Sequence, residues 1–235
     1  MSDALRAYTA AALTHLQDVV AANAAALTEA AGLVLAAWRA DQLVYSLGSG
    51  HSTSGVVETF YRAGGLPFVR PLWHPDLLPL NGAGASTEAE RRTGLGGELV
   101  TDVAEGDVLV VFSSSGINPV PVEAALAARD AGASVVAVTS RAASDAGPSR
   151  AGTRLYEVAD VVLDTRVPPG DVTWPAADPR TAPQSSLANA LLWNAVLVLC
   201  ADAEPAVPFW RSANVGEGPS NETLLHRYGT RVPEL

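Results

Sequence analysis

Two serine- and glycine-rich segments constrain this chain most, because each comes directly after a short apolar run. They span residues 48–55 and 113–119, after apolar runs at 43–47 and 108–112 that we expect to form buried strands. A loop that ends a strand and opens a helix offers backbone N–H groups, small hydroxyls and a helix N-terminus to an anion. The pair therefore predicts one phosphorylated ligand held between the two loops.

Strand-like and helix-like patterns alternate along the rest of the chain. Further strands are expected at residues 66–73, 134–138 and 158–163, and helices at 52–63, 119–131 and 185–201. This alternation predicts a three-layer α/β domain with a five-stranded parallel sheet in the order 2-1-3-4-5, covering residues 1–235 as one unit. Ligands bind such a sheet at the carboxyl ends of the first and third strands, which are the strands that carry the two loops.

Three other segments complete the expected organisation. Residues 1–40 form an apolar helical arm, expected in two helices or one bent helix, and residues 205–235 form a tail. Ser86 is expected to cap a helix that breaks near residues 94–97 and then resumes. Residues 164–183, rich in Pro and Asp, are expected to form a long loop.

Composition excludes several classes of function. All 15 basic residues are Arg, which excludes Schiff-base lysine chemistry and a lysine-containing phosphate loop. The net charge of −10 argues against a nucleic-acid partner or an anionic membrane surface. The four histidines are scattered and Cys200 stands alone, so we expect no metal and no cofactor. No signal peptide or membrane span is apparent, and we expect a cytoplasmic protein.

These features resemble the SIS (sugar isomerase) phosphosugar-binding domain. The segments that carry the resemblance are residues 47–52, 112–119 and 136–140, and it covers about residues 1–205. Residues around His51, residues 86–94 and residues 212–215 further resemble small stand-alone SIS proteins. These look related to amino-sugar phosphate enzymes, including a dehydratase of N-acetylglucosamine 6-phosphate and, more distantly, the N-acetylmuramic acid 6-phosphate etherase.

The resemblance implies which residues hold the sugar phosphate. Matching the SIS motifs position by position gives two groups, one that binds through side chains and one that shapes the backbone. The binding group is Ser49, Ser52, Ser113, Ser115 and Asn118, and the shaping group is Gly50, Ser114 and Gly116.

Candidate catalytic residues follow from the same resemblance. Glu58 lies on the helix after the first loop, where SIS enzymes often have a glutamate that faces the sugar. One turn later, where the etherase has its first catalytic glutamate, this chain has Arg62, so the etherase mechanism does not transfer directly. Glu90 matches the segment that supplies the second acid, with Glu88 as its competitor. His51 is the candidate for opening the sugar ring or polarising a carbonyl, and a helix-capping role is the alternative.

Three functions remain open from the sequence. The first is a lyase that dehydrates an N-acetylhexosamine 6-phosphate, which needs two carboxylates in opposite protonation states. The second is an aldose–ketose phosphosugar isomerase, for which one glutamate suffices. The third is a phosphosugar sensor without catalysis. The apolar N-terminal arm predicts a homodimer or a higher homo-oligomer, and the tail residues Asn214 and His226 are candidates for completing a neighbouring subunit's site.

Overall fold

A five-stranded parallel sheet forms the centre of the computed structural model, which describes residues 1–212, 214 and 220–235. The strand order is β2-β1-β3-β4-β5, as the sequence predicts. The strands are β1 (Val44–Gly48), β2 (Val69–Leu72), β3 (Val108–Phe112), β4 (Ser134–Thr139) and β5 (Val161–Asp164). Every residue of β1 and β3 is buried, as expected for Val-rich parallel strands covered on both faces.

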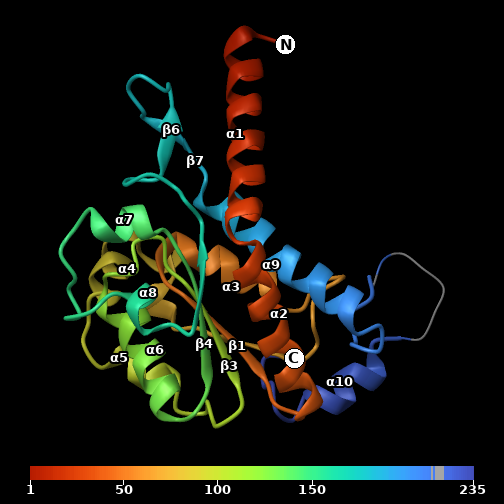
Figure 1. Ribbon diagram of the computed structural model, residues 1–235. Coiled ribbons are helices and arrows are strands. Elements are labelled where there is room, and N and C mark those ends of the chain that lie inside the picture. Colours follow the sequence, from red (N-terminus) through yellow and green to blue (C-terminus); the bar gives the residue numbers. More distant parts are fainter. Residues whose placement is uncertain (213, 215–219) are drawn as a thin grey trace.

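Helices cover both faces of this sheet (Figure 1). One layer consists of α2 (Ala24–Arg39), α3 (Thr53–Thr59) and α9 (Ser185–Ala203). The opposite layer contains α5 (Leu95–Leu99), α6 (Pro119–Asp130) and α8 (Leu155–Val158). The shorter helices are α4 (Ala83–Ala89), α7 (Arg141–Asp145) and α10 (Glu222–Tyr228), with 3-10 turns η1 (Gly50–Ser52), η2 (Pro75–Leu77) and η3 (Pro79–Asn81).

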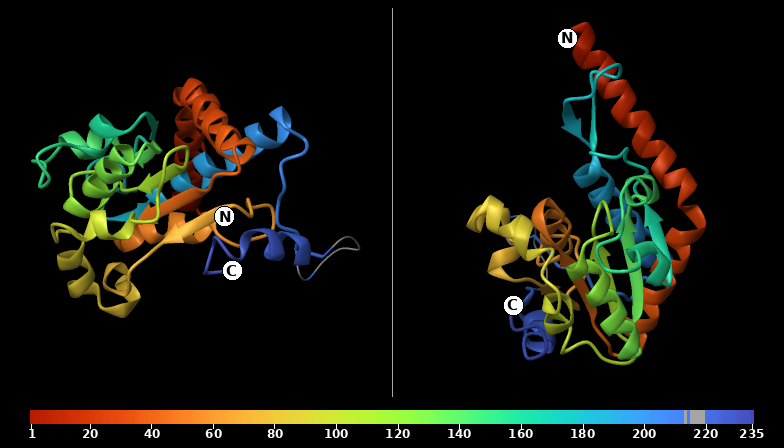
Figure 2. Two further views of the ribbon diagram at one scale, coloured as in Figure 1. Left: turned by 90° about the horizontal axis from the view of Figure 1, so that it is seen from below. Right: turned by 90° about the vertical axis from the view of Figure 1, so that its left-hand side faces the viewer.

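The N-terminal arm consists of two helices, α1 (Asp3–Ala22) and α2, bent by 65° at their junction. The buried side chain of Asn23 holds this bend, because it donates to the carbonyls of Val19 and Asp164 and accepts from the N–H of Asp164. The first half of α1 extends beyond the sheet in both Figure 1 and Figure 2. Its exposed side chains include Leu5 and Leu13. The arm is therefore anchored at one end and projects at the other.

The helix α9 is the longest apolar segment of the core layer. By length and composition it could cross a membrane, and α1 and α2 pass the same test only as a bent pair. In the structure α9 packs against α1, α2 and α3, and Leu192, Trp193 and Val196 are buried there.

Two of the expected helices have different bounds in the structure. The helix expected at 52–63 ends at Thr59, because Tyr61 adopts φ +38° and the N–H of Gly64 donates to the carbonyl of Trp210. The helix α4 begins at Ala83, so Ser86 lies inside it and donates to the Ala83 carbonyl instead of capping. The break expected near residues 94–97 lies earlier, between the end of α4 at Ala89 and the start of α5 at Leu95.

The expected loop at 164–183 contains a hairpin. Its strands are β6 (Val172–Trp174) and β7 (Thr181–Pro183), paired antiparallel. Figures 1 and 2 show that the hairpin extends beside the projecting half of α1. The fifth strand begins at Val161 and not at 158, because residues 155–158 form α8.

Candidate active site

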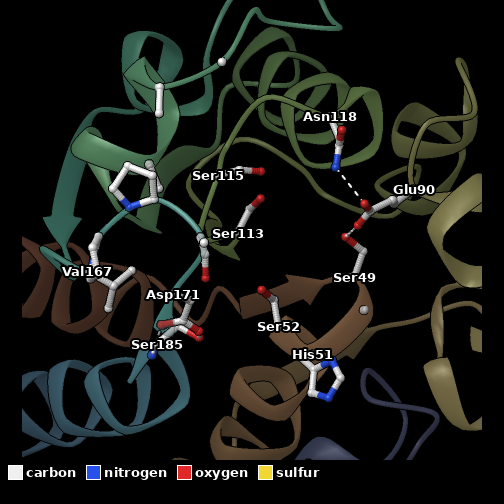
Figure 3. A pocket seen from close by; sticks show the side chains of 18 of the residues that line it. Ser49, His51, Ser52, Glu90, Ser113, Ser115, Asn118, Val167, Asp171 and Ser185 are labelled. Carbon is white, nitrogen blue, oxygen red and sulfur yellow. Dashed lines mark hydrogen bonds between the residues drawn. The ribbon is translucent and has the colours of Figure 1, made fainter. Parts of the chain in front are cut away.

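A cavity of about 550 Å³ lies where the strand order reverses, at the carboxyl ends of β1 and β3. Both serine- and glycine-rich loops line it, as Figure 3 shows. The lining includes all five residues predicted to bind the phosphate, Ser49, Ser52, Ser113, Ser115 and Asn118, and two of the residues predicted to shape the backbone, Gly50 and Ser114. Gly116 lies in the same loop but does not line the cavity. This position agrees with the switch-point rule for open α/β sheets.

The second loop is held rigidly by backbone hydrogen bonds. The N–H of Ser113 donates to the Val138 carbonyl, and the carbonyl of Ser114 accepts from the N–H of Ser140. Gly50 and Gly116 take φ +57° and +58°, the left-handed region that favours glycine. Asn118 then precedes Pro119 at the first turn of α6, so the helix N-terminus faces the cavity side of the loop.

The hydroxyls of the two loops differ in what they can still bind. The hydroxyl of Ser113 accepts the Gly116 N–H at 3.2 Å, and that of Ser49 donates to Glu90 Oε2 at 3.1 Å. Ser52 and Ser115 point into the cavity in Figure 3. The donor of the Ser49 hydroxyl is therefore used by Glu90, whereas the Ser113 hydroxyl, which accepts, still has its proton to donate.

Glu90, at the end of α4, is a half-buried carboxylate in the cavity wall. Its Oε1 accepts from Asn118 Nδ2 at 2.8 Å and its Oε2 from Ser49, so two predicted phosphate ligands are paired with this acid. Burial raises the pKa of Glu90, and the hydrogen bonds from Ser49 and Asn118 and the charges of Arg91 and Arg150 oppose that rise. A buried carboxyl with a raised pKa is suited to proton transfer.

The other candidate acids lie elsewhere. Glu58, predicted to face the sugar, does not line the cavity; it pairs with Arg62 and accepts from Asn194 Nδ2 of α9 at 3.0 Å. Glu88 is exposed and also lies outside the lining, whereas its neighbour Thr87 is part of it. The structure thus brings Glu90, and neither of the other two glutamates, to the predicted phosphate loops.

His51 lines the cavity at the N-terminal end of α3 and is exposed to solvent. Figure 3 places its imidazole below Ser52, on the side of the cavity away from Asn118. This position allows contact with a bound ligand. Among the residues that the structure describes, no group of three or more His, Cys, Asp or Glu side chains could hold a metal ion.

Asp171 is a lining residue that the sequence did not reveal. It adopts φ +61° and lies across the cavity from Glu90 in Figure 3. Its carboxylate accepts the N–H groups of Gln184 and Ser185 and the Ser185 hydroxyl, and so caps the start of α9. Asp171 lies 13 residues before Gln184, the first residue whose N–H it accepts, so no capping motif in the local sequence predicts this role.

The tail residues lie apart from this cavity. Asn214 lines a separate hollow with Tyr61 and Trp210, and His226 is exposed on α10. Residues 213 and 215, which share the resemblance at 212–215, lie outside the described residues.

Comparison with known proteins agrees with this geometry. A family model described as the SIS domain matches residues 7–140, more than half of the chain. The chain belongs to the SIS-domain family. A UPF0309 protein of Brucella canis is 39% identical to this SIS-domain protein over 233 residues, covering 96% of this chain and 95% of the relative. A UPF0309 protein of Brucella melitensis biotype 2 matches equally well, with the same identity and coverage.

Solved structures share the fold of this SIS-domain protein at low sequence identity. Phosphoheptose isomerase GmhA from Neisseria gonorrhoeae aligns with TM-score 0.55 and 20% identity, over 83% of this chain and 96% of that chain. A phosphoheptose isomerase from Francisella tularensis gives TM-score 0.55 at 17% identity, over 86% and 100%. The Vibrio vulnificus NanR protein complexed with ManNAc-6P gives TM-score 0.53 at 14% identity, over 99% and 72%.

Proposed function

We propose that this SIS-domain protein is a hydro-lyase that dehydrates an N-acetylhexosamine 6-phosphate, with N-acetylglucosamine 6-phosphate as the first substrate to test. The observation that carries the proposal is that one cavity combines two serine- and glycine-rich loops with carboxylates on opposite walls. A phosphate at Ser52 and Ser115 leaves the sugar between Glu90 and Asp171. The ligand named for NanR, also an N-acetylhexosamine 6-phosphate, supports this substrate class.

The chemistry requires two proton transfers on the open-chain sugar. A base takes the proton from C2, which the neighbouring aldehyde makes acidic, and the electron pair of that bond becomes the enolate. When the enolate collapses, the C2–C3 double bond forms and the C3–O bond breaks. An acid then protonates the departing oxygen, and water is lost.

We assign these two roles to the carboxylates that the described part of the chain places in the cavity. Burial raises the pKa of Glu90, which favours a protonated carboxyl and suits the acid that protonates the C3 oxygen. Asp171, on the opposite wall, is assigned the base, and its three donors favour its ionised form and hold it in place. His51 is assigned to ring opening, because it is the imidazole that lines the cavity. Glu58 receives no role in this assignment.

Isomerisation is the second candidate, because it shares the first proton transfer and because phosphoheptose isomerases are among the structural neighbours. It returns the proton to C1 and expels nothing. A sensor without catalysis is the third, supported by the ManNAc-6P complex of NanR.

One incubation separates these functions. The protein is mixed with N-acetylglucosamine 6-phosphate and the products are followed by chromatography and mass spectrometry. We expect the mass of one water to be lost. An unchanged mass with altered retention would show isomerisation, and an unchanged sugar that nevertheless binds would show a sensor.

A further inference from the structure

Arg150 lies beside the second loop but is not part of the cavity lining. It belongs to the segment between α7 and α8, and its backbone N–H donates to the carbonyl of Ile117 at 2.9 Å. Its guanidinium Nη1 donates to Asn118 Oδ1 at 2.8 Å. An arginine from a segment more than 30 residues later in the chain is thus fixed to the loop by both its backbone and its side chain.

This contact determines which way the Asn118 amide faces. A guanidinium can only donate hydrogen bonds, so the oxygen of the amide must point to Arg150. The amide nitrogen is then directed to Glu90, and it donates to Oε1 at 2.8 Å. Without the arginine, the amide oxygen loses the donor that holds it, and only the bond to Glu90 keeps the Asn118 side chain in place.

We propose that Arg150 is a positioning residue for the reaction assigned above: it orients Asn118, and Asn118 holds the Glu90 carboxyl against the cavity. The proposal rests on the proposed function for its catalytic meaning. The hydrogen-bonded series runs from Arg150 through Asn118 to Glu90, whose second oxygen is held by Ser49. Arg150 acts through another side chain and does not itself touch the cavity.

Arg91 supplies a matched control. It is exposed, adjoins Glu90 in the chain, and lowers the pKa of Glu90 through its charge, as Arg150 also does. Arg91 acts by charge without the bond to Asn118 that Arg150 makes. Replacing either arginine with methionine removes one positive charge near the same carboxyl. A difference between Arg150→Met and Arg91→Met therefore reports the orientation of Asn118 and not the loss of charge.

The first measurement does not depend on activity. The side-chain NH₂ signals of Asn118 are assigned in ¹H–¹⁵N spectra by their loss in Asn118→Ala, and their exchange with water is measured. We expect exchange to be on the order of 10-fold faster in Arg150→Met than in the parent, the factor carried by a hydrogen bond that involves a charged group. Arg91→Met should exchange like the parent. Equal exchange in the parent and Arg150→Met would overturn the proposal.

The second measurement uses turnover of N-acetylglucosamine 6-phosphate. Arg150→Met should lower kcat about 10-fold with little change in KM. Arg91→Met should change kcat less, and it should shift the alkaline limb of the pH profile, which the acid Glu90 sets, to higher pH. In the Asn118→Ala background, Arg150→Met should have no effect beyond that of its lost charge, which Arg91→Met measures, because the residue that it orients is gone. Additive losses would contradict the series. If the parent protein does not turn over the sugar, the proposed function fails, and the NMR exchange still decides the role of Arg150.

Discussion

Removing a single hydroxyl from the cavity tests where the phosphate binds. Ser52→Ala and Ser115→Ala each delete one side-chain donor that points into the cavity. A hydrogen bond to a charged group contributes roughly 1.5–3 kcal/mol, which corresponds to about 10- to 150-fold in affinity. Both serines are half-exposed, so water competes for the same phosphate oxygens and the lower end applies. We expect each variant to weaken binding about 10-fold.

Isothermal titration with N-acetylglucosamine 6-phosphate measures this change. Ser54→Ala is the matched control, because Ser54 is an exposed serine on the same helix whose hydroxyl faces Ser186 on α9 and not the cavity. Its affinity should equal that of the parent. The two loops come from different strands, so the double variant should lose about 100-fold if the contacts are independent. Parental affinity in both single variants would refute the phosphate assignment.

Three other outcomes follow from the structure. Glu90→Gln should lower turnover on the order of 100- to 10,000-fold while binding survives, whereas Glu58→Gln should stay near the parental rate. A larger loss of turnover in Glu58→Gln than in Glu90→Gln would reject the assignment. The pKa of Glu90 is raised in the fold, so its contribution to stability is present below the ordinary value of 4.5 and is lost as pH rises through the folded pKa. The melting temperature of the parent should therefore fall relative to that of Glu90→Gln over that pH range. Melting temperatures that change in parallel would contradict the shift. Light scattering should give at least a dimer, because Leu5 and Leu13 are 49% and 57% exposed on the projecting half of α1, and a monomer at micromolar concentration would exclude this.

The sheet and the position of the two serine- and glycine-rich loops were predictable because their determinants are local. Runs such as residues 108–112 are apolar throughout and rich in valine, which in a chain of alternating elements indicates a buried parallel strand. Each loop follows its strand directly, so the strand order alone brings the loops together. The confirmed order 2-1-3-4-5 thus placed the cavity correctly before any side chain was positioned.

The choice among the acids depended on long-range packing. Glu58 is on the expected helix, but α3 turns it toward Asn194 of α9 and not toward the sugar site. Glu88 and Glu90 are two residues apart, and only the path of α4 decides that Glu90 meets Ser49 and Asn118. The spacing of these glutamates in the sequence predicts neither the direction of Glu58 nor the choice between Glu88 and Glu90.

Asp171 could not be found for a different reason. Its carboxylate caps a helix from the far side of the β6–β7 hairpin, and the hairpin itself was expected to be loop. The short strands of the hairpin are flanked by Pro and Asp residues, which are typical of turns. A residue that such a hairpin positions can be recognised as a candidate site residue only when the structure shows that it lines the cavity.

A crystal structure of Glu90→Gln with N-acetylglucosamine 6-phosphate tests the central claim most directly, because the variant should bind the sugar without converting it. We predict the phosphate between Ser52 and Ser115, with the C2–C3 bond of the sugar between residue 90 and Asp171. A phosphate bound away from the two loops, or a sugar whose C2 and C3 lie beyond hydrogen-bond reach of both residues, would contradict the account.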